Sequence, residues 1–388
     1  MKIAGIICEY NPFHNGHKYL VERAKEDGAA VVAVMSGNYT QRGELAVADK
    51  YVRAESAIKN GADLVLELPF PFCMSSAEFF SKGGVAVLER IGANKICFGS
   101  ESGDSELIKE AAKAAASEEF IGLKNSISVK EGAAARYFEA LEKVMGEKRG
   151  LLSNDILGVE YVKEINRRGL DMEIEVVKRL GDAYRDEKIN SSYASATAIR
   201  GKLYAGENVD LGEVMPTETL EVLKNAVNRG EAPVSVKKIE TALLAFWRLA
   251  DPSALGDIAE LGNGLEFRIK DAAMTSSTFE ELERNSATKS YTSAKIRRGI
   301  LFGALGVTKA DLDSEPHYTT VLAANKIGRE ILSSLRKEDG EMVIVTKPAD
   351  APACRQSELS ARADALYTLA LPTAQTSGYL TKKKIYME

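Results

Sequence analysis

Short apolar runs alternate with segments of helical periodicity over the first hundred residues. The apolar runs cover residues 2–8, 30–35, 63–68 and 94–98, and the helical patterns cover residues 15–27, 49–59 and 75–91. Continuous apolar runs that end in turn residues are typical of strands buried on both faces of a sheet. Strands that alternate with helices predict an α/β fold with a parallel sheet. Ligands of such sheets bind beyond the carboxyl ends of the strands, so we expect the functional site in the loops that follow these runs.

The rest of the chain is mostly helical in pattern. Residues 104–170 include clear helical segments at 131–144 and 153–166, residues 172–177 alternate as a fifth strand does, and a short helix is expected at 195–204. Met215-Pro216 opens a largely helical region with one strand-like run at 342–345. We therefore predict an α/β domain over residues 1–212 and a mainly α-helical domain over residues 213–388.

Composition excludes several classes of protein. The 388 residues are 45% hydrophobic and 28% charged, as is ordinary for a soluble globular protein. No apolar run approaches the ~20 residues of a membrane-spanning helix, and the run at residues 1–8 stops at Glu9, too short for a signal peptide. The four scattered cysteines form no CxxC pair, so no zinc knuckle or disulfide framework is indicated and a reducing cytoplasm is expected. The net charge of −5 does not indicate a nucleic-acid binder, so any such site has to be a local basic patch.

The segment Asn11-Pro12-Phe13-His14-Asn15-Gly16-His17 carries the strongest chemical pattern. It holds two of the three histidines, follows the first strand and opens the first helix. A helix N-terminus offers free N–H groups and the positive end of the helix dipole, which favour a phosphate. Two imidazoles there can donate to phosphate oxygens while charge builds at the α-phosphorus. The alternatives are a surface turn and a metal-binding HxxH pair, for which no third ligand is evident.

A second pattern is Ser195-Ala196-Thr197-Ala198-Ile199-Arg200. Ser195 is suited to be an N-cap, and Thr197 and Arg200 share one helix face. Hydroxyls and a guanidinium at a helix start form a clamp for the β- and γ-phosphates of a nucleotide. Taken alone, the segment favours a capped helix with a solvated arginine.

Together, the two patterns resemble the nucleotidyltransferase superfamily with the HIGH motif. That resemblance implies an ATP site on a Rossmann-like sheet and the transfer of AMP with release of pyrophosphate. It implies that His14 and His17 stabilise the transition state at the α-phosphate. Ser195, Thr197 and Arg200 would then hold the leaving pyrophosphate.

Residues 5–17, 35–44, 61–69, 98–101 and 153–161 resemble the tRNA(Met) cytidine acetate ligase family more narrowly. The resemblance implies a nucleotidyltransferase domain followed by a helical tRNA-binding part. It implies that acetate and ATP form acetyl-adenylate, and that the acetyl group passes to N4 of the wobble cytidine, position 34, of elongator tRNA(Met). Mg²⁺ is expected with ATP, although the motifs name no metal ligand. A small-molecule adenylyltransferase and a non-catalytic ATP-binding protein are the alternatives.

The same resemblance implies a set of ATP contacts. They are Ile7, Cys8, Glu9, Tyr10, Asn11, Pro12, Phe13, His14, Asn15, Gly16, His17, Lys18, Tyr19, Leu20, Gly99, Ser100, Glu101, Asn154, Arg179, Ser195, Thr197 and Arg200. From the residues alone, Asn154 is also suited to cap a helix, and Arg179 to end a strand as an ordinary charge. Gln41, Arg42, Lys50 and Arg53 follow the second strand at the expected ligand edge, or lie on a solvated loop and helix face.

One basic segment is the candidate tRNA contact. Five basic residues and no acid lie between residues 284 and 298, namely Arg284, Lys289, Lys295, Arg297 and Arg298, with Tyr291 among them. Lys382, Lys383 and Lys384 lie near the C-terminus between two tyrosines. Basic side chains with interleaved aromatics are suited to a phosphate track with base stacking, and a solvated helix face is the alternative.

Overall fold

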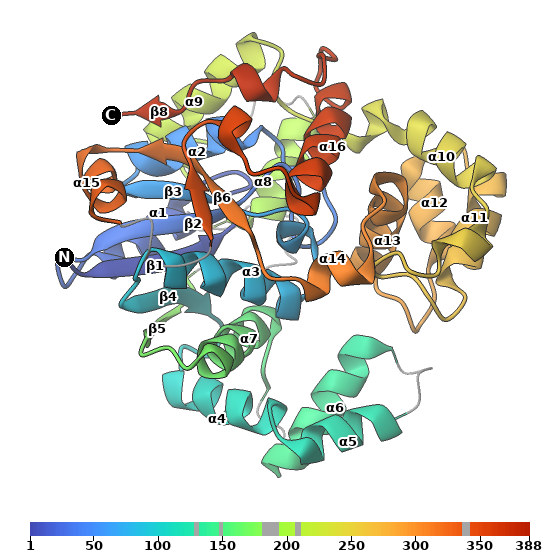
Figure 1. Cartoon of the computed structure of the whole chain (residues 1–388), viewed down its shortest axis with the longest axis horizontal. Helices are drawn as coiled ribbons and strands as arrows, with labels where there is room; N and C mark the ends of the chain where they lie inside the picture. The colour runs from blue at the N-terminus through green and yellow to red at the C-terminus, as the bar shows by residue number, and fades with distance from the viewer. Residues whose placement is uncertain (128–131, 147–149, 181–193, 206–210, 336–341) are drawn as a thin grey trace.

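A central sheet with helices on both faces forms the larger part of the molecule in the computed structural model (Figure 1). The structure describes residues 1–127, 132–146, 150–180, 194–205, 211–335 and 342–388. The strands are β1 (Ile3–Cys8), β2 (Ala30–Ser36), β3 (Leu64–Leu68), β4 (Lys95–Ser100), β5 (Glu173–Lys178), β6 (Tyr318–Ala324), β7 (Val343–Val345) and β8 (Tyr386–Met387). The helices are α1 (Asn15–Ala24), α2 (Lys50–Lys59), α3 (Ala77–Arg90), α4 (Ser105–Ala115), α5 (Glu118–Ser126), α6 (Ala133–Met145), α7 (Ser153–Arg168), α8 (Ala196–Ala205), α9 (Thr217–Asn228), α10 (Glu240–Leu249), α11 (Leu265–Thr275), α12 (Phe279–Ser286), α13 (Ser293–Leu305), α14 (Lys309–Asp313), α15 (Lys326–Ser334) and α16 (Arg355–Leu369).

The sheet has the strand order β5-β4-β1-β2-β3-β6-β7, with β8 paired to β6. The first five strands of the chain are parallel to one another, whereas β6 runs antiparallel to its neighbour β3. The prediction of an α/β fold with a parallel sheet is therefore confirmed. Since β2 and β3 lie on one side of β1 and β4 and β5 on the other, the strand order reverses between β1 and β4. Ligands of open α/β sheets bind at this point, beyond the carboxyl ends of the strands.

Helices cover both faces of the sheet, which explains the continuous apolar runs of the strands. Ile6 and Val31 belong to the core that includes residues of α1 and α2, whereas Ile7 and Val32 belong to the core that includes residues of α3 and α7. Helix α3 lies directly on β1, because a Cβ added at Gly84 would lie 2.5 Å from Ile7 Cδ1. This close packing fixes the position of β1 and of the loop that follows it.

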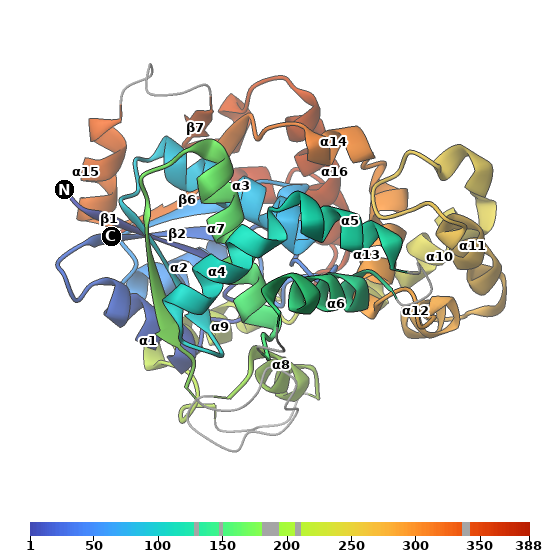
Figure 2. The same cartoon turned by 90° about the horizontal axis from the view of Figure 1, so that it is seen from below.

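Helices α10 to α13 form a lobe beside the sheet in both views (Figures 1 and 2). Trp247 on α10 is buried and donates from Nε1 to the Ile300 carbonyl on α13 at 3.1 Å. A Cβ added at Gly303 would lie 2.6 Å from Trp247 Cζ2, so α10 and α13 pack closely. The part of the chain after residue 212 is mainly helical, as predicted.

The prediction of a single strand-like run after residue 212 is wrong. The run at 342–345 forms β7, but β6 and β8 also join the sheet, and all seven residues of β6 are buried. The chain therefore returns to the sheet after the helical lobe. A boundary near residue 212 does not divide the sheet from everything that follows.

A buried cluster of three charged side chains joins α16, which follows the helical lobe in the chain, to α2 and β3. Lys50 Nζ lies 2.8 Å from Glu67 Oε1 on β3 and 3.1 Å from Asp364 Oδ2 on α16. Burial alone would lower the pKa of Lys50, but the Asp364 and Glu67 carboxylates outweigh it, so the pKa is raised well above its ordinary value. Lys50 therefore has a structural role and does not line the ligand edge.

Lys50→Ala leaves two carboxylates buried without their cation. We expect the free energy of unfolding to fall by about 3–5 kcal/mol, because removing one partner of a buried ion pair leaves an uncompensated charge. Lys59→Ala on the same helix is the matched control, since Lys59 pairs with Glu55 at the surface. Lys59→Ala should lower the free energy of unfolding by less than about 1 kcal/mol, because an exposed ion pair contributes little. Urea unfolding of the variants measures both values, and equal losses would contradict the structural role.

Candidate active site

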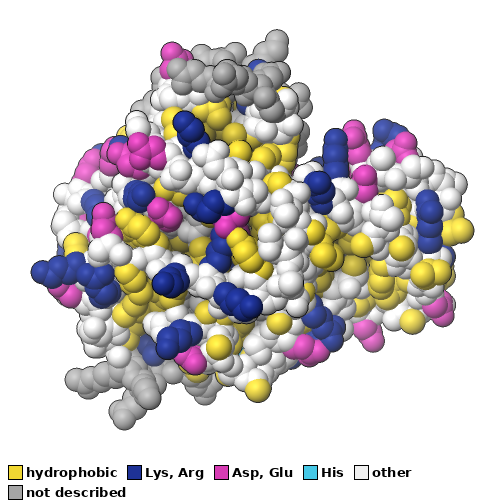
Figure 3. Space-filling model, turned by 90° about the horizontal axis from the view of Figure 1, so that it is seen from above, with side chains coloured by type: hydrophobic (Ala, Val, Ile, Leu, Met, Phe, Trp, Pro, Cys, Tyr) yellow, Lys and Arg dark blue, Asp and Glu magenta, His cyan; other side chains and the backbone are white. Residues whose placement is uncertain are grey.

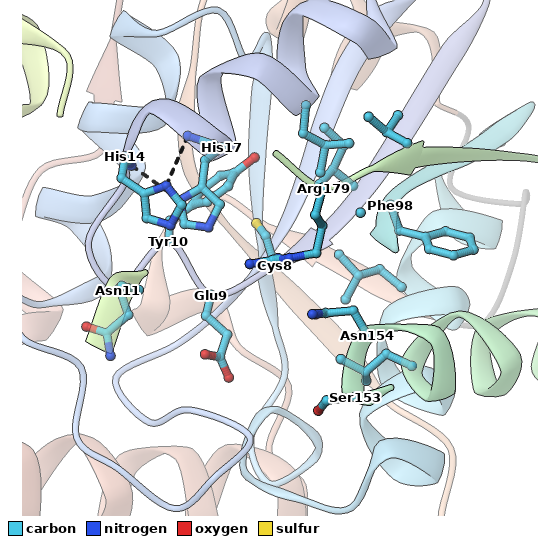
Figure 4. A pocket seen from close by; sticks show the side chains of 18 of the residues that line it. Cys8, Glu9, Tyr10, Asn11, His14, His17, Phe98, Ser153, Asn154 and Arg179 are labelled. Atoms are coloured by element: carbon cyan, nitrogen blue, oxygen red, sulfur yellow. Dashed lines mark hydrogen bonds between the residues drawn. The ribbon is translucent and has the colours of Figure 1, made fainter. Parts of the chain in front are cut away.

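A cavity of about 190 Å³ lies at the carboxyl ends of β1 and β4, where the strand order reverses. Figure 4 shows side chains from β1, α1, β4, α7 and the end of β5 around it. Most of the expected ATP contacts line this cavity. They are Ile7, Cys8, Glu9, Tyr10, Asn11, His14, Gly16, His17, Tyr19, Leu20, Gly99, Asn154, Arg179 and Arg200.

The other expected contacts do not line the cavity: Pro12, Phe13, Asn15, Lys18, Ser100, Glu101, Ser195 and Thr197. Several of them support its wall. The Phe13 ring packs against Tyr10, with 4.7 Å between the ring centroids. The Asn15 side chain donates to the Glu213 carbonyl at 2.9 Å, and Ser195 Oγ accepts from the Ala198 N–H at 3.1 Å in the first turn of α8.

The two histidines of the first motif are fixed by the backbone of the helix start. His14 is the N-cap of α1, and its Nδ1 accepts from the Gly16 N–H at 3.1 Å. His17 Nδ1 accepts from the His14 N–H at 3.3 Å. The two rings stack with 3.7 Å between their centroids, side by side in Figure 4. Because each Nδ1 accepts a hydrogen bond, each neutral ring carries its proton on Nε2.

Burial keeps both imidazoles neutral. It lowers the pKa of His14 to about 3, with Arg179 and Arg200 acting in the same direction. Burial also lowers the pKa of His17 well below its ordinary value, helped by His14 and Arg179. The pair therefore presents two neutral Nε2–H donors, which suits the stabilisation of negative charge without proton transfer.

Arg200 on α8 reaches the site across the first motif. Its guanidinium donates to the Asn11 carbonyl and to Glu44 Oε2, each at 3.0 Å. Thr197 Oγ1 accepts from the same guanidinium at 3.4 Å, so these two residues share a face of α8 as predicted. Arg200 thus lies in the cavity wall with a carboxylate partner behind it.

Arg179 and Asn154 form another part of the wall. Figure 4 shows the Arg179 side chain extending between Cys8 and Asn154, and a Cβ at Gly99 would lie 3.3 Å from Arg179 Cγ. Among the described residues, no carboxylate within ion-pair distance of Arg179 is found. Asn154 is not the N-cap of α7, because Leu152 has that position. The Asn154 side chain instead donates from Nδ2 to Glu101 Oε1 at 2.5 Å. Glu101 therefore orients Asn154 from outside the cavity.

Part of the wall was not expected from the sequence. The apolar and aromatic members are Ile6, Phe80, Phe98, Leu157, Tyr161, Val177 and Leu180, and the others include Ser153 and Lys178. Gln41 and Arg42, expected near the ligand edge, do line the cavity, and Arg42 Nη2 donates to Ser153 Oγ at 3.2 Å. Arg53 does not line it, because its side chain is buried beneath the loops.

The basic segment after residue 284 divides into exposed and paired side chains. Arg284 and Lys289 are exposed, whereas Lys295 pairs with Glu260 at 3.3 Å. Arg297 Nη1 lies 2.7 Å from Glu44, and Arg298 Nε lies 2.7 Å from Glu260. Arg298 also donates from Nη1 to the Gln41 carbonyl at 3.1 Å, so Arg297 and Arg298 fasten α13 to the loop after β2 through Glu44 and Gln41. On the face shown in Figure 3, Lys and Arg side chains are scattered with Asp and Glu between them.

Two properties of the described part of the chain bear on possible partners. No group of three or more His, Cys, Asp or Glu side chains in it could hold a metal ion. No helix in the same residues combines the length and the apolar character needed to cross a bilayer.

The lowered pKa values predict a pH dependence of stability. From pH 6.5 down to about 3 the unfolded chain binds protons at His14 and His17 that the native protein excludes, so the fold loses stability as pH falls. His14→Gln removes one such group. We expect the stability loss between pH 6.5 and 5 to be about 1–2 kcal/mol smaller in this variant, measured by urea unfolding. Equal losses would show that native His14 takes up a proton in this range.

Comparison with known proteins identifies the family. The model described as HIGH Nucleotidyl Transferase matches residues 1–382. The tRNA(Met) cytidine acetate ligase of Acetivibrio thermocellus is 35% identical over 95% of this chain and 95% of its own length. That of Caldicellulosiruptor saccharolyticus is 39% identical over 87% of this chain and 86% of its own length.

Two solved structures of Thermotoga maritima TmcAL have the same fold. The apo form I superposes with a TM-score of 0.91 at 30% identity and covers 100% of this chain and 99% of its own. The form bound with alpha-thio ATP has a TM-score of 0.89 at 30% identity and covers 100% of each chain. The chain belongs to the HIGH nucleotidyltransferase family and, within it, to the tRNA(Met) cytidine acetate ligases.

Proposed function

We propose that the protein activates acetate with ATP and transfers the acetyl group to N4 of the wobble cytidine, position 34, of elongator tRNA(Met). One observation carries the proposal: the neutral imidazoles of the buried His14 and the half-buried His17 line the cavity at a helix N-terminus, each with Nε2–H as its donor, where the strand order of the sheet reverses. Relatives that match most of the chain bear the name of this activity, and a solved relative binds an ATP analogue.

In the first step, an acetate oxygen attacks the α-phosphorus of ATP and the bond to pyrophosphate breaks. Negative charge grows on the α-phosphate oxygens, where the Nε2–H groups of His14 and His17 and the N-terminus of α1 would donate. Arg179 and Arg200 both line the cavity and would hold the remaining phosphates. Arg200 would divide its donors between the phosphates and Glu44.

Mg²⁺ is part of the proposal as a companion of ATP. No group of three or more His, Cys, Asp or Glu side chains that could hold the ion is found among the described residues, and phosphate oxygens and water would supply most of its ligands. No side chain of the protein is therefore assigned to the metal ion.

In the second step, acetyl-adenylate must survive until the cytosine amine arrives. The apolar wall formed by Phe80, Phe98 and Leu157 would exclude water from the mixed anhydride. A cytosine flipped out of the anticodon loop would enter the same cavity.

We propose that tRNA binds partly on the helical lobe of the region after residue 212, through the exposed Arg284 and Lys289. We place the protein in the cytoplasm, where tRNA is found. Its four cysteines are free thiols, as expected in a reducing compartment.

The test of function combines two assays on the purified protein. Pyrophosphate release from ATP is measured with and without acetate, and nucleosides of added elongator tRNA(Met) are analysed by mass. Acetate-dependent release with an acetylated cytidine supports the proposal. Release without acetate dependence and without a tRNA product would favour a small-molecule adenylyltransferase.

His17→Ala should lower kcat/KM for acetate-dependent pyrophosphate release by at least about 100-fold, because one donor to the transition state is lost. His317→Ala is the matched control, since His317 lies outside the cavity, and it should keep the wild-type rate. Thermal unfolding checks that both variants are folded. A His17→Ala protein with near-wild-type release would refute the assigned role.

Arg284→Glu combined with Lys289→Glu should weaken tRNA binding and reduce its salt dependence by about one unit of slope per lost phosphate contact. Lys109→Glu with Lys113→Glu on α4 makes the same charge change at exposed positions on another part of the molecule. Filter binding at several salt concentrations compares the two double variants. If both lose the same affinity, the effect is one of net charge and the lobe has no special part in tRNA binding.

A further inference from the structure

The transfer step of the proposed function requires a proton acceptor. When N4 of cytidine attacks the acetyl carbonyl carbon, the nitrogen becomes positively charged and must lose one proton to yield the amide. The amino group of cytosine is a weak nucleophile, so a base that takes the proton as the N–C bond forms would speed the step. This inference therefore rests on the proposed function.

Most titratable groups around the cavity are unable to accept that proton. His14 and His17 use Nδ1 to accept backbone N–H groups and carry a proton on Nε2. Burial raises the pKa of the Cys8 thiol and of the Tyr10 and Tyr161 hydroxyls, so these groups stay protonated. The remaining titratable groups in the wall, apart from Tyr19 and Glu9, are lysine and arginine side chains, which are donors without an acceptor atom.

Glu9 is the one carboxylate among the described residues that line the cavity. It follows the last residue of β1, and Figure 4 shows its side chain within the pocket. Its Oε1 accepts from the Gln41 N–H at 2.8 Å, which fixes the direction of the carboxylate. Within the described residues, Oε2 has no hydrogen-bond partner and is available to a ligand.

The position of Glu9 is fixed from the backbone side as well. Its carbonyl accepts from Arg53 Nη1 at 2.5 Å, and Tyr10 beyond it has a φ of 45° that turns the chain sharply. The pKa of Glu9 is raised above its ordinary value, mainly because the carboxylate is buried and also because Glu44 lies nearby. The hydrogen bond from the Gln41 N–H and the charges of Arg200 and Arg42 lower the pKa but do not outweigh burial. A carboxylate whose pKa is raised by its surroundings is a stronger proton acceptor than one in water.

We propose that Glu9 is the general base of the acetyl transfer. N4 of cytidine attacks the carbonyl carbon of acetyl-adenylate, and Glu9 Oε2 takes one N4 proton as the N–C bond forms. The bond between the carbonyl carbon and the phosphate oxygen breaks, and AMP leaves with that electron pair. The proton passes from Glu9 to water when the products leave.

The test separates the two half-reactions in the intact protein. Glu9→Gln keeps an oxygen that accepts from the Gln41 N–H but is unable to take a proton. ATP–pyrophosphate exchange with acetate measures the first step, and single-turnover formation of acetylcytidine from synthetic acetyl-adenylate and elongator tRNA(Met) measures the second. We expect the second rate to fall about 100-fold or more beyond any change in the first.

Two further variants sharpen the result. Glu9→Asp keeps a carboxylate and should recover part of the transfer rate, whereas Glu119→Gln, an exposed carboxylate on α5, should behave as wild type. Equal losses of both steps in Glu9→Gln would show a role in holding ATP or its metal ion and would overturn the proposal. Full transfer by Glu9→Gln would place the base elsewhere. Absence of acetylcytidine with the wild-type protein would instead refute the proposed function, and the role of Glu9 with it.

Discussion

One buried guanidinium holds together the two loops that form the site. Arg53 on α2 is only 2% exposed and donates to the carbonyl oxygens of Glu9, Ser36, Gly37 and Ala48. Each of these carbonyls would cost about 1–3 kcal/mol if it were buried without a partner. The turn after β1 and the loop after β2 therefore keep their positions relative to one another. The histidine pair is placed by the first of these loops, and the wall formed by Gln41 and Arg42 by the second.

The histidine site could be predicted because its geometry is local in sequence. Each imidazole accepts from an N–H group within three residues, so the helix start alone fixes both rings. The edge of the sheet that holds the cavity follows from the alternation of apolar runs and helices, which predicts a parallel sheet with its ligands beyond the carboxyl ends of the strands. Asn154 and Arg179 lie in the wall because α7 and β5 border the same strand, β4.

The remaining features depend on contacts between distant segments, which a pattern along one sequence does not contain. In the sequence, Arg297 and Arg298 are indistinguishable from exposed basic residues that could contact RNA. In the folded protein they pair with Glu44 and Glu260, which are distant in sequence and lie next to α13. Phe80 enters the wall through the packing of α3 on β1, and nothing in its neighbourhood marks it. Strand β6 is a short run of buried residues within a helical region, and its antiparallel partner β3 is about 250 residues away.

That separation has a consequence for biosynthesis. The edge of β3 stays without a partner until residues 318–324 have been made, which at 5–20 residues per second takes on the order of 10–50 s. Over this interval the nascent chain exposes an apolar strand edge, a surface that invites pairing with other chains. Glu67 on that strand also waits for Asp364 to complete the group around Lys50. A fragment that stops near residue 212 would keep this open edge permanently, so the first half of the chain is a poor substitute for the whole protein.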